Sequence, residues 1–186
     1  MLLYTIPGYL QEAKIIKRPS KICKTPYVAD ILVKVNDTSD FAPYLAHTPC
    51  LGCCGLADAG AIVLVSEIES PKGVCTHSVN LAKINTKGQN IFIGIHTKLA
   101  EIITKNAILN NCITNLQNVT QLEREKKYLN SRFDFTGIQS NGRRFILEVK
   151  SVPLADYEDI SAKDRKKKDY SDRAYNSKVA YFPDGY

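Results

Sequence analysis

The chain has 186 residues, of which 44% are apolar and 24% are charged, a composition typical of a globular protein. Its length allows one large domain or two small ones. No apolar run approaches the roughly 20 residues that a membrane-spanning helix needs, and the opening segment does not resemble a signal peptide. Six cysteines are too few for a disulfide scaffold of this length, so reduced thiols are expected, in the cytoplasm or, in a eukaryote, the nucleus.

The net charge of +6 is unevenly distributed along the chain. The charges of residues 155–186 cancel, so the basic excess lies in residues 1–154. Clustered basic side chains suit the phosphate backbone of a nucleic acid, although a solvated surface has the same composition. The candidate nucleic-acid-binding residues from these clusters are Lys14, Lys17, Arg18, Lys21 and Arg132.

Short strands separated by turn residues are predicted for the first half. Runs of β-branched or alternating apolar residues, each bounded by Pro, Gly, Asn or Asp, occur at residues 13–17, 28–35, 61–67 and 74–81. Several such strands within about 85 residues favour a small barrel, for example of the OB type, which often binds oligonucleotides. We expect this nucleic-acid-binding domain at residues 1–85, with the junction at residues 85–88.

A different pattern begins after that junction. A strand is predicted at residues 90–95, and Thr97 can cap a helix over residues 98–110, where apolar residues recur with helical spacing. Three further strands are predicted at residues 121–128, 132–138 and 143–152. This order favours a mixed α/β core at residues 86–186, and therefore an α+β chain.

A charged segment at about residues 155–178 has few large apolar residues and includes an unbroken run of charges at residues 163–168. It is predicted to be a flexible insertion, with a DNA-contacting arm as the alternative.

The motif with the clearest chemistry is Asp134 followed, after a gap, by Glu148-Val149-Lys150. An acid, a gap and Glu-x-Lys form the pattern of the PD-(D/E)XK nuclease superfamily. Cleavage of a phosphodiester uses a hard divalent cation, here Mg²⁺ or Mn²⁺, which takes carboxylate oxygens from Asp134 and Glu148. Lys150, two positions after Glu148 on one strand face, can orient water or offset developing charge. The alternative is an exposed ion pair, worth roughly 0–1 kcal/mol.

The connection between these two strands sets their register. It contains Ser140-Asn141-Gly142. A two-residue Asn-Gly turn would pair Asp134 with Val149 and send the two carboxylates to opposite faces. A three-residue loop with Gly142 in the left-handed conformation pairs Asp134 with Glu148, and we predict this loop.

Two other groups of residues are candidates for a site. Glu125, on the preceding predicted strand, is either a further acid or a surface charge among its basic neighbours. Cys50, Cys53, Cys75 and His77 are four soft ligands that could hold zinc, but their spacing is not that of a standard zinc finger. Small buried cysteines are the alternative.

Longer segments resemble the sugar fermentation stimulation protein family. Residues 124–135 (REKKYLNSRFDF) resemble its REVKYG-NSR-DF stretch, residues 148–154 (EVKSVPL) its EVKSVTL, and residues 182–184 its FPDA. In the first half the match is looser, and it covers residues 8–18, 28–30, 47–49 and 60–63. The chain departs from the family at residues 49–55, where the family has PNTGSM, and it ends at residue 186, where the family pattern continues with a helix and a strand.

The resemblance implies an OB-like domain, a PD-(D/E)XK nuclease-like domain without its closing C-terminal elements, and DNA binding that is not sequence-specific. By position, Asp134 and Glu148 would be the metal carboxylates, Lys150 the catalytic lysine and Glu125 an accessory acid. The expected function is metal-dependent hydrolysis of phosphodiester bonds in single- or double-stranded DNA. The alternative is a non-catalytic DNA-binding or regulatory protein of the same family.

Overall fold

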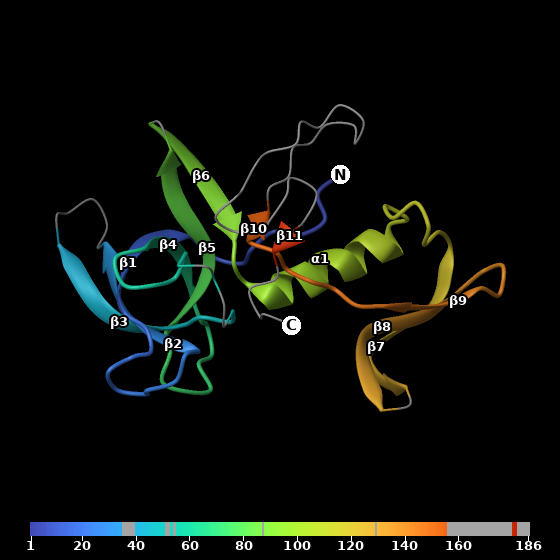
Figure 1. Ribbon diagram of the computed structural model, residues 1–186, viewed down its shortest axis with the longest axis horizontal. Helices are drawn as coiled ribbons and strands as arrows, with labels where there is room; N and C mark the ends of the chain where they lie inside the picture. The colour runs from blue at the N-terminus through green and yellow to red at the C-terminus, as the bar shows by residue number, and fades with distance from the viewer. Residues whose placement is uncertain are drawn as a thin grey trace, which may run out of the picture. The chain divides into compact units, whose positions relative to one another are not determined.

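The computed structural model describes residues 1–34, 40–50, 53, 55–86, 88–128, 130–155 and 180–181. Within these residues the protein is mostly β with one α-helix (Figure 1). The chain divides into two compact units. The helix unit consists of Met1–Pro7 and Thr97–Lys150, and the sheet unit consists of Gly8–His96 and Ser151–Tyr186. The described part of the chain contains no helix long and apolar enough to cross a membrane.

A six-stranded sheet forms most of the sheet unit. Its strands are β1 (Gln11–Lys17), β2 (Val28–Lys34), β3 (Phe41–His47), β4 (Ile62–Glu67), β5 (His77–Thr86) and β6 (Gln89–Gly94), in the order β3-β2-β1-β4-β5-β6. Neighbouring strands are antiparallel. A parallel pairing of β3 with β5, through Ala46 with His77 and His47 with Ser78, closes a circuit β1-β2-β3-β5-β4.

Alternation along these strands produces the core of the sheet unit. In β1, Ala13 and Ile15 are buried while Lys14 between them is exposed. Val63 and Val65 of β4 are completely buried in the same way. Successive side chains of a strand point to opposite faces, so apolar residues two positions apart fill the interior.

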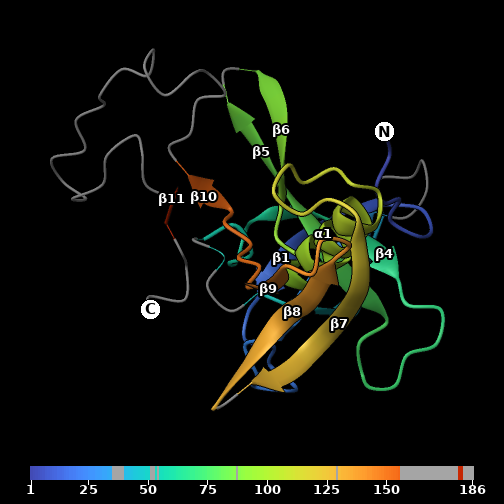
Figure 2. The ribbon, with the colours of Figure 1, turned by 90° about the vertical axis from the view of Figure 1, so that its right-hand side faces the viewer.

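The helix unit begins with α1 (Thr97–Leu109) and continues with a three-stranded sheet. The sheet has the order β7-β8-β9, with β7 at Val119–Tyr128, β8 at Ser131–Gln139 and β9 at Arg144–Leu147. β7 and β8 form a long twisted hairpin (Figure 2). After α1, Asn111 has a φ of 55°, and the amides of Asn111 and Cys112 donate to the carbonyls of Ile108 and Ala107. This Schellman-type arrangement ends the helix.

The structure differs from the sequence predictions at several points. A domain junction was expected at residues 85–88, but Asn85 and Thr86 belong to β5, and Gly88, with a φ of 80°, directly precedes β6. An Asn-Gly-rich turn has the same composition in a hairpin as in a linker, so local sequence does not separate the two. The strand β3 was not predicted. The strand predicted at residues 143–152 is shorter, because β9 ends at Leu147.

The last strands, β10 (Leu154–Ala155) and β11 (Ala180–Tyr181), pair antiparallel with each other in the sheet unit. Most of the charged segment predicted at residues 155–178 lies outside the described residues, as do residues 182–184 of the family resemblance.

Candidate functional site

The register of the three-stranded sheet aligns the predicted acids. Between β7 and β8, Arg124 pairs with Phe135 and Lys126 with Phe133, which puts Glu125 opposite Asp134. Between β8 and β9, Phe135 pairs with Leu147, the last residue of β9, and Glu148 follows directly after it. Glu125 and Asp134 therefore lie opposite each other across β7 and β8, and Glu148, just beyond β9, completes the row of acids.

The loop between β8 and β9 produces this register. Gly142 has a φ of 81°, and its amide donates to the carbonyl of Gln139 at 2.9 Å. The amide of Gln139 donates to the carbonyl of Arg143, also at 2.9 Å, and so closes a three-residue loop. Glycine adopts this left-handed backbone without the steric cost of a Cβ atom. The predicted three-residue connection is confirmed.

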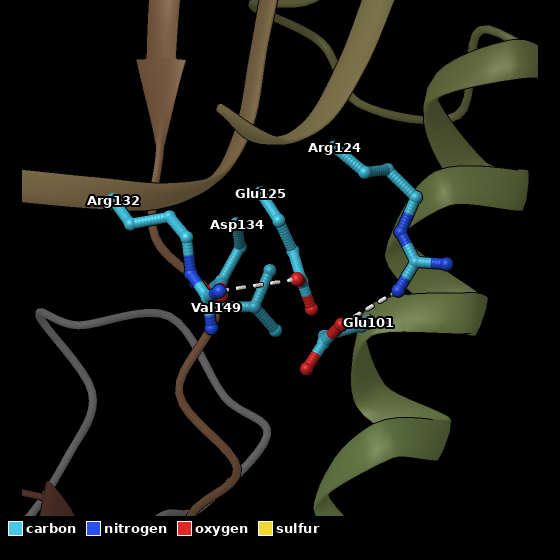
Figure 3. A network of polar contacts seen from close by, with 6 residues as sticks. All are labelled: Glu101, Arg124, Glu125, Arg132, Asp134 and Val149. Atoms are coloured by element: carbon cyan, nitrogen blue, oxygen red, sulfur yellow. Dashed lines mark hydrogen bonds and ion pairs between the residues drawn. The ribbon is translucent and has the colours of Figure 1, made fainter. Parts of the chain in front are cut away.

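Asp134 holds the chain just beyond the end of β9. Its Oδ2 accepts a hydrogen bond of 2.6 Å from the backbone amide of Val149 (Figure 3). Because Glu148, Val149 and Lys150 lie beyond the strand, the expectation that Glu148 and Lys150 share a strand face is wrong. In a longer β9 the amide of Val149 would have donated to the backbone of β8, but here it donates to the carboxylate of Asp134.

Glu148 and Lys150 nevertheless lie together. Lys150 Nζ donates to Glu148 Oε1 at 3.1 Å, and about half of each side chain is exposed. An exposed pair of this kind stabilises the fold by only roughly 0–1 kcal/mol. Both groups are therefore accessible to a substrate.

Glu125 adopts an unusual backbone conformation. Its φ is 52°, in the left-handed region that non-glycine residues seldom occupy. Its Oε2 lies 3.6 Å from Nη1 of Arg132, and both side chains are exposed. Residues held in such conformations are concentrated at functional sites. Arg132, predicted as a nucleic-acid contact, thus lies beside the row of acids (Figure 3).

Sequence analysis missed a link between α1 and this sheet. Arg124 Nη2 donates to Glu101 Oε2 of α1 at 2.7 Å, and its guanidinium carbon lies 5.8 Å from the centroid of the Phe135 ring. Phe135 is completely buried. Glu101 and Arg124 are 23 residues apart, and no local sequence signal connects them.

The carboxylates of Asp134 and Glu148 are of the ligand type that a hard divalent cation takes. Among the described residues, no three His, Cys, Asp or Glu side chains gather to hold a metal ion. Mg²⁺, however, keeps several waters and is commonly bound by one or two carboxylates together with substrate phosphates. Asp134 on β8 and Glu148 just beyond β9 are the two carboxylates that could hold such an ion.

The candidate zinc ligands are not gathered into such a group in the part of the chain that the structure describes. Cys50 and Cys53 are buried, and Cys53 Sγ donates to the carbonyl of Cys50 at 3.3 Å. The hydrogen bond with Cys50 and burial both raise the pKa of the Cys53 thiol. Burial also raises the pKa of Cys75 and lowers that of His77. Protonated, buried thiols match the alternative of small core cysteines.

The first basic cluster divides into exposed and engaged side chains. Lys14, Lys17 and Lys21 are exposed. Arg18 is only partly exposed, and its guanidinium donates to the carbonyls of Pro26, at 2.8 Å, and Cys50. The predicted role of Arg18 as a nucleic-acid contact therefore competes with its bridging of two chain segments.

Asp30 anchors the loop that carries this cluster. It accepts hydrogen bonds from the Ser20 hydroxyl at 2.6 Å and the Lys21 amide at 3.0 Å. Burial alone would raise the pKa of Asp30, but these hydrogen bonds and the charges of Lys21 and Lys17 hold it below its usual value.

A carboxyl whose pKa is lowered by folding contributes stability above its unfolded pKa of about 3.9 and loses it as the pH falls through the folded value. We expect Asp30→Asn to be less stable than wild type at pH 7, with the difference shrinking progressively below pH of about 4. Urea unfolding of both proteins between neutral pH and pH of about 3 measures it. A stability difference that stays constant over this range would contradict the linkage.

Each comparison with known proteins finds similarity to the same family. Residues 98–163 match the family described as the sugar fermentation stimulation protein RE domain. The sugar fermentation stimulation protein homolog of Clostridium tetani is 28% identical over 148 residues, which are 79% of this chain and 58% of that protein. The homolog of Clostridium botulinum strain Hall is 30% identical over 144 residues, 77% of this chain and 56% of that protein. The chain thus spans less than two thirds of the length of these relatives.

Among solved structures, that of Pyrococcus furiosus SfsA in complex with Ca²⁺ is similar, with a TM-score of 0.65. It is 19% identical, and the match covers 84% of this chain and 61% of that one. The likeness therefore concerns the fold. The matched segment and the two Clostridium homologs make the chain similar to the sugar fermentation stimulation protein family over residues 98–163 and over 79% and 77% of its length.

Proposed function

We propose that this protein binds DNA and hydrolyses its phosphodiester bonds with a divalent cation. The observation that carries the proposal is the register that puts Glu125, Asp134 and Glu148 in one row, with Lys150 paired to Glu148. The Ca²⁺ complex of the Pyrococcus furiosus relative supports it, because Ca²⁺ also takes oxygen ligands.

The proposed fold assignments follow from the pairings. The closed circuit β1-β2-β3-β5-β4 of the sheet unit supports an OB-like barrel. In the helix unit, α1 followed by β7, β8 and β9 supports a PD-(D/E)XK nuclease-like core, with Asp134 on its second strand and Glu148 directly after its third. DNA binding would then belong to the sheet unit and cleavage to the helix unit.

In this proposal Asp134 and Glu148 hold Mg²⁺ or Mn²⁺, which when bound polarises a phosphoryl oxygen and lowers the pKa of water. The hydrogen bond from Val149 fixes the carboxylate of Asp134 in one orientation. Lys150 orients a water molecule or offsets charge that develops on the phosphate. Arg132, whose fork of N–H donors matches a phosphate, binds the DNA backbone beside the row of acids.

We expect Lys150→Ala to abolish cleavage of labelled single- and double-stranded DNA in Mg²⁺ or Mn²⁺, as EDTA does for wild type. The reason is that Lys150 forms an ion pair with Glu148, at 3.1 Å, and so lies beside the proposed metal carboxylates. Lys98→Ala is the matched control, because Lys98 is an exposed lysine on α1 of the same unit. If Lys150→Ala cleaves DNA at the wild-type rate, Lys150 has no role in the mechanism. If the wild-type protein binds DNA without cutting it, the proposed nuclease activity is rejected.

A second candidate function is DNA binding without cleavage. It is favoured by exposed lysines and an exposed aromatic ring on neighbouring strands of the sheet unit. Lys14 of β1 pairs with Leu32 of β2, and Lys34 of β2 pairs with Phe41 of β3, which is 54% exposed. Exposed aromatic rings stack on bases, and lysines contact phosphates.

We expect Lys14→Ala to weaken binding to different DNA sequences by the same factor, because a phosphate contact carries no base information. The slope of log affinity against log salt should fall in magnitude by about 1. Fluorescence anisotropy at several salt concentrations measures both. Lys72→Ala, an exposed lysine in the loop before β5, is the control. An unchanged slope for Lys14→Ala would place the DNA elsewhere.

A further inference from the structure

A hollow of about 620 Å³ lies on the three-stranded sheet of the helix unit. Known ligand pockets have volumes of roughly 300–1,000 Å³. Six of the side chains that line it carry the argument: Gln121, Lys126, Thr136, Ile138, Arg144 and Ile146.

The hollow begins next to the row of acids. Thr136 of β8 pairs with Ile146 of β9. Thr136 lies two positions after Asp134, and Ile146 lies two positions before Glu148. Residues two apart on a strand share a face and are separated by roughly 7 Å. Phe135, between Asp134 and Thr136, is completely buried, and its partner Arg124 reaches α1. The hollow and the acids therefore share the other face of the sheet.

The lining of the hollow combines apolar and polar side chains. Ile138 is partly buried, and Ile146 is 49% exposed, which is high for isoleucine. Gln121 and Thr136 contribute hydrogen-bonding groups beside them. A nucleobase has the same division, with apolar faces and an edge of donors and acceptors.

Charge at the edge of the hollow favours an anionic ligand. Lys126 forms an ion pair with Glu123, so these two charges offset each other. Arg144 is exposed, and no carboxylate of the described residues forms an ion pair with it. A guanidinium here can bind the phosphate attached to a base that occupies the hollow.

We propose that this hollow is a nucleobase subsite. It receives an unpaired base of the nucleotide next to the phosphate held at Asp134 and Glu148. A base stacked in a duplex cannot enter it, so the substrate is single-stranded or locally unpaired DNA. The position of the cleaved phosphate rests on the proposed function, whereas binding of the base depends only on the hollow.

The test is methyl NMR of isoleucine-labelled wild-type protein in EDTA, so that neither metal nor cleavage is involved. Titration with deoxyadenosine or thymidine monophosphate should shift the methyl signals of Ile138 and Ile146. Deoxyribose 5-phosphate, which lacks a base, should not. Ile103 of α1, 40% exposed, is the control signal and should remain unchanged. Absence of shifts at millimolar nucleotide, or equal shifts with deoxyribose 5-phosphate, would overturn the subsite.

A variant extends the test to DNA. Ile146→Asp should lower the affinity for a thymidine oligonucleotide by about tenfold and leave that for an abasic oligonucleotide unchanged. Ile103→Asp, the matched control, should change neither. If the protein cleaves DNA but nucleotides shift no methyl signals, the subsite is rejected and the proposed nuclease activity stands. If nucleotides shift the signals but DNA is not cleaved, the subsite stands and the nuclease activity is rejected.

Discussion

Asp134→Asn is expected to lower metal-dependent cleavage of DNA by roughly 100-fold or more while changing the free energy of unfolding by no more than about 0.5 kcal/mol. The amide oxygen of asparagine can still accept the hydrogen bond from Val149, which is 2.6 Å long in the structure. The substitution removes the negative charge that a hard divalent cation requires. Cleavage assays measure the first effect and urea unfolding the second. Calorimetric titration with Mn²⁺ measures the loss of metal affinity that removal of the charge should cause.

Asp134→Ala provides the comparison. It removes both the charge and the acceptor, so it should also lower the free energy of unfolding by about 1 kcal/mol. If Asp134→Asn binds Mn²⁺ and cleaves DNA like wild type, Asp134 serves only to hold the chain at Val149. The metal site would then have to be rejected, although the fold around it would stand.

Phe135→Ala is expected to lower the free energy of unfolding of the helix unit by about 3–5 kcal/mol. Phe135 is completely buried, and the Arg124 guanidinium lies over its ring. Removal of the ring leaves a cavity and takes away the surface on which Arg124 packs. Urea unfolding followed by far-ultraviolet circular dichroism measures the loss.

Ile146→Ala is the control for that experiment. Ile146 lies on the neighbouring strand but is 49% exposed, so its truncation should cost less than about 1 kcal/mol. Equal losses for the two variants would mean that the core of this unit is not centred on Phe135. Because Phe135 precedes Thr136 and follows Asp134, its variant should also reduce cleavage indirectly.

The candidate site was predictable from sequence to the extent that local rules determine it. Gly142 favours a left-handed residue at the end of the loop, and the strict two-residue period of a strand then decides which residue faces Asp134. The extent of β9 was not predictable in this way. The strand ends at Leu147 because a side chain on β8 binds the next free amide, and residue patterns do not record such competition.

The sequence by itself determined the helix, predicted at residues 98–110 and found at Thr97–Leu109, most of the strands, the β8–β9 register and the resemblance to one family. Each depends on residues near one another in the chain, where periodicity and turn chemistry act directly. Only the tertiary structure decided that β3 closes on β5, that Arg18 bridges Pro26 and Cys50, and that Arg124 joins Glu101 to Phe135. The contacts of β3 with β5, Arg18 with Cys50 and Arg124 with Glu101 join residues far apart in the chain, and such partners are chosen by packing and burial of the whole unit rather than by any local pattern.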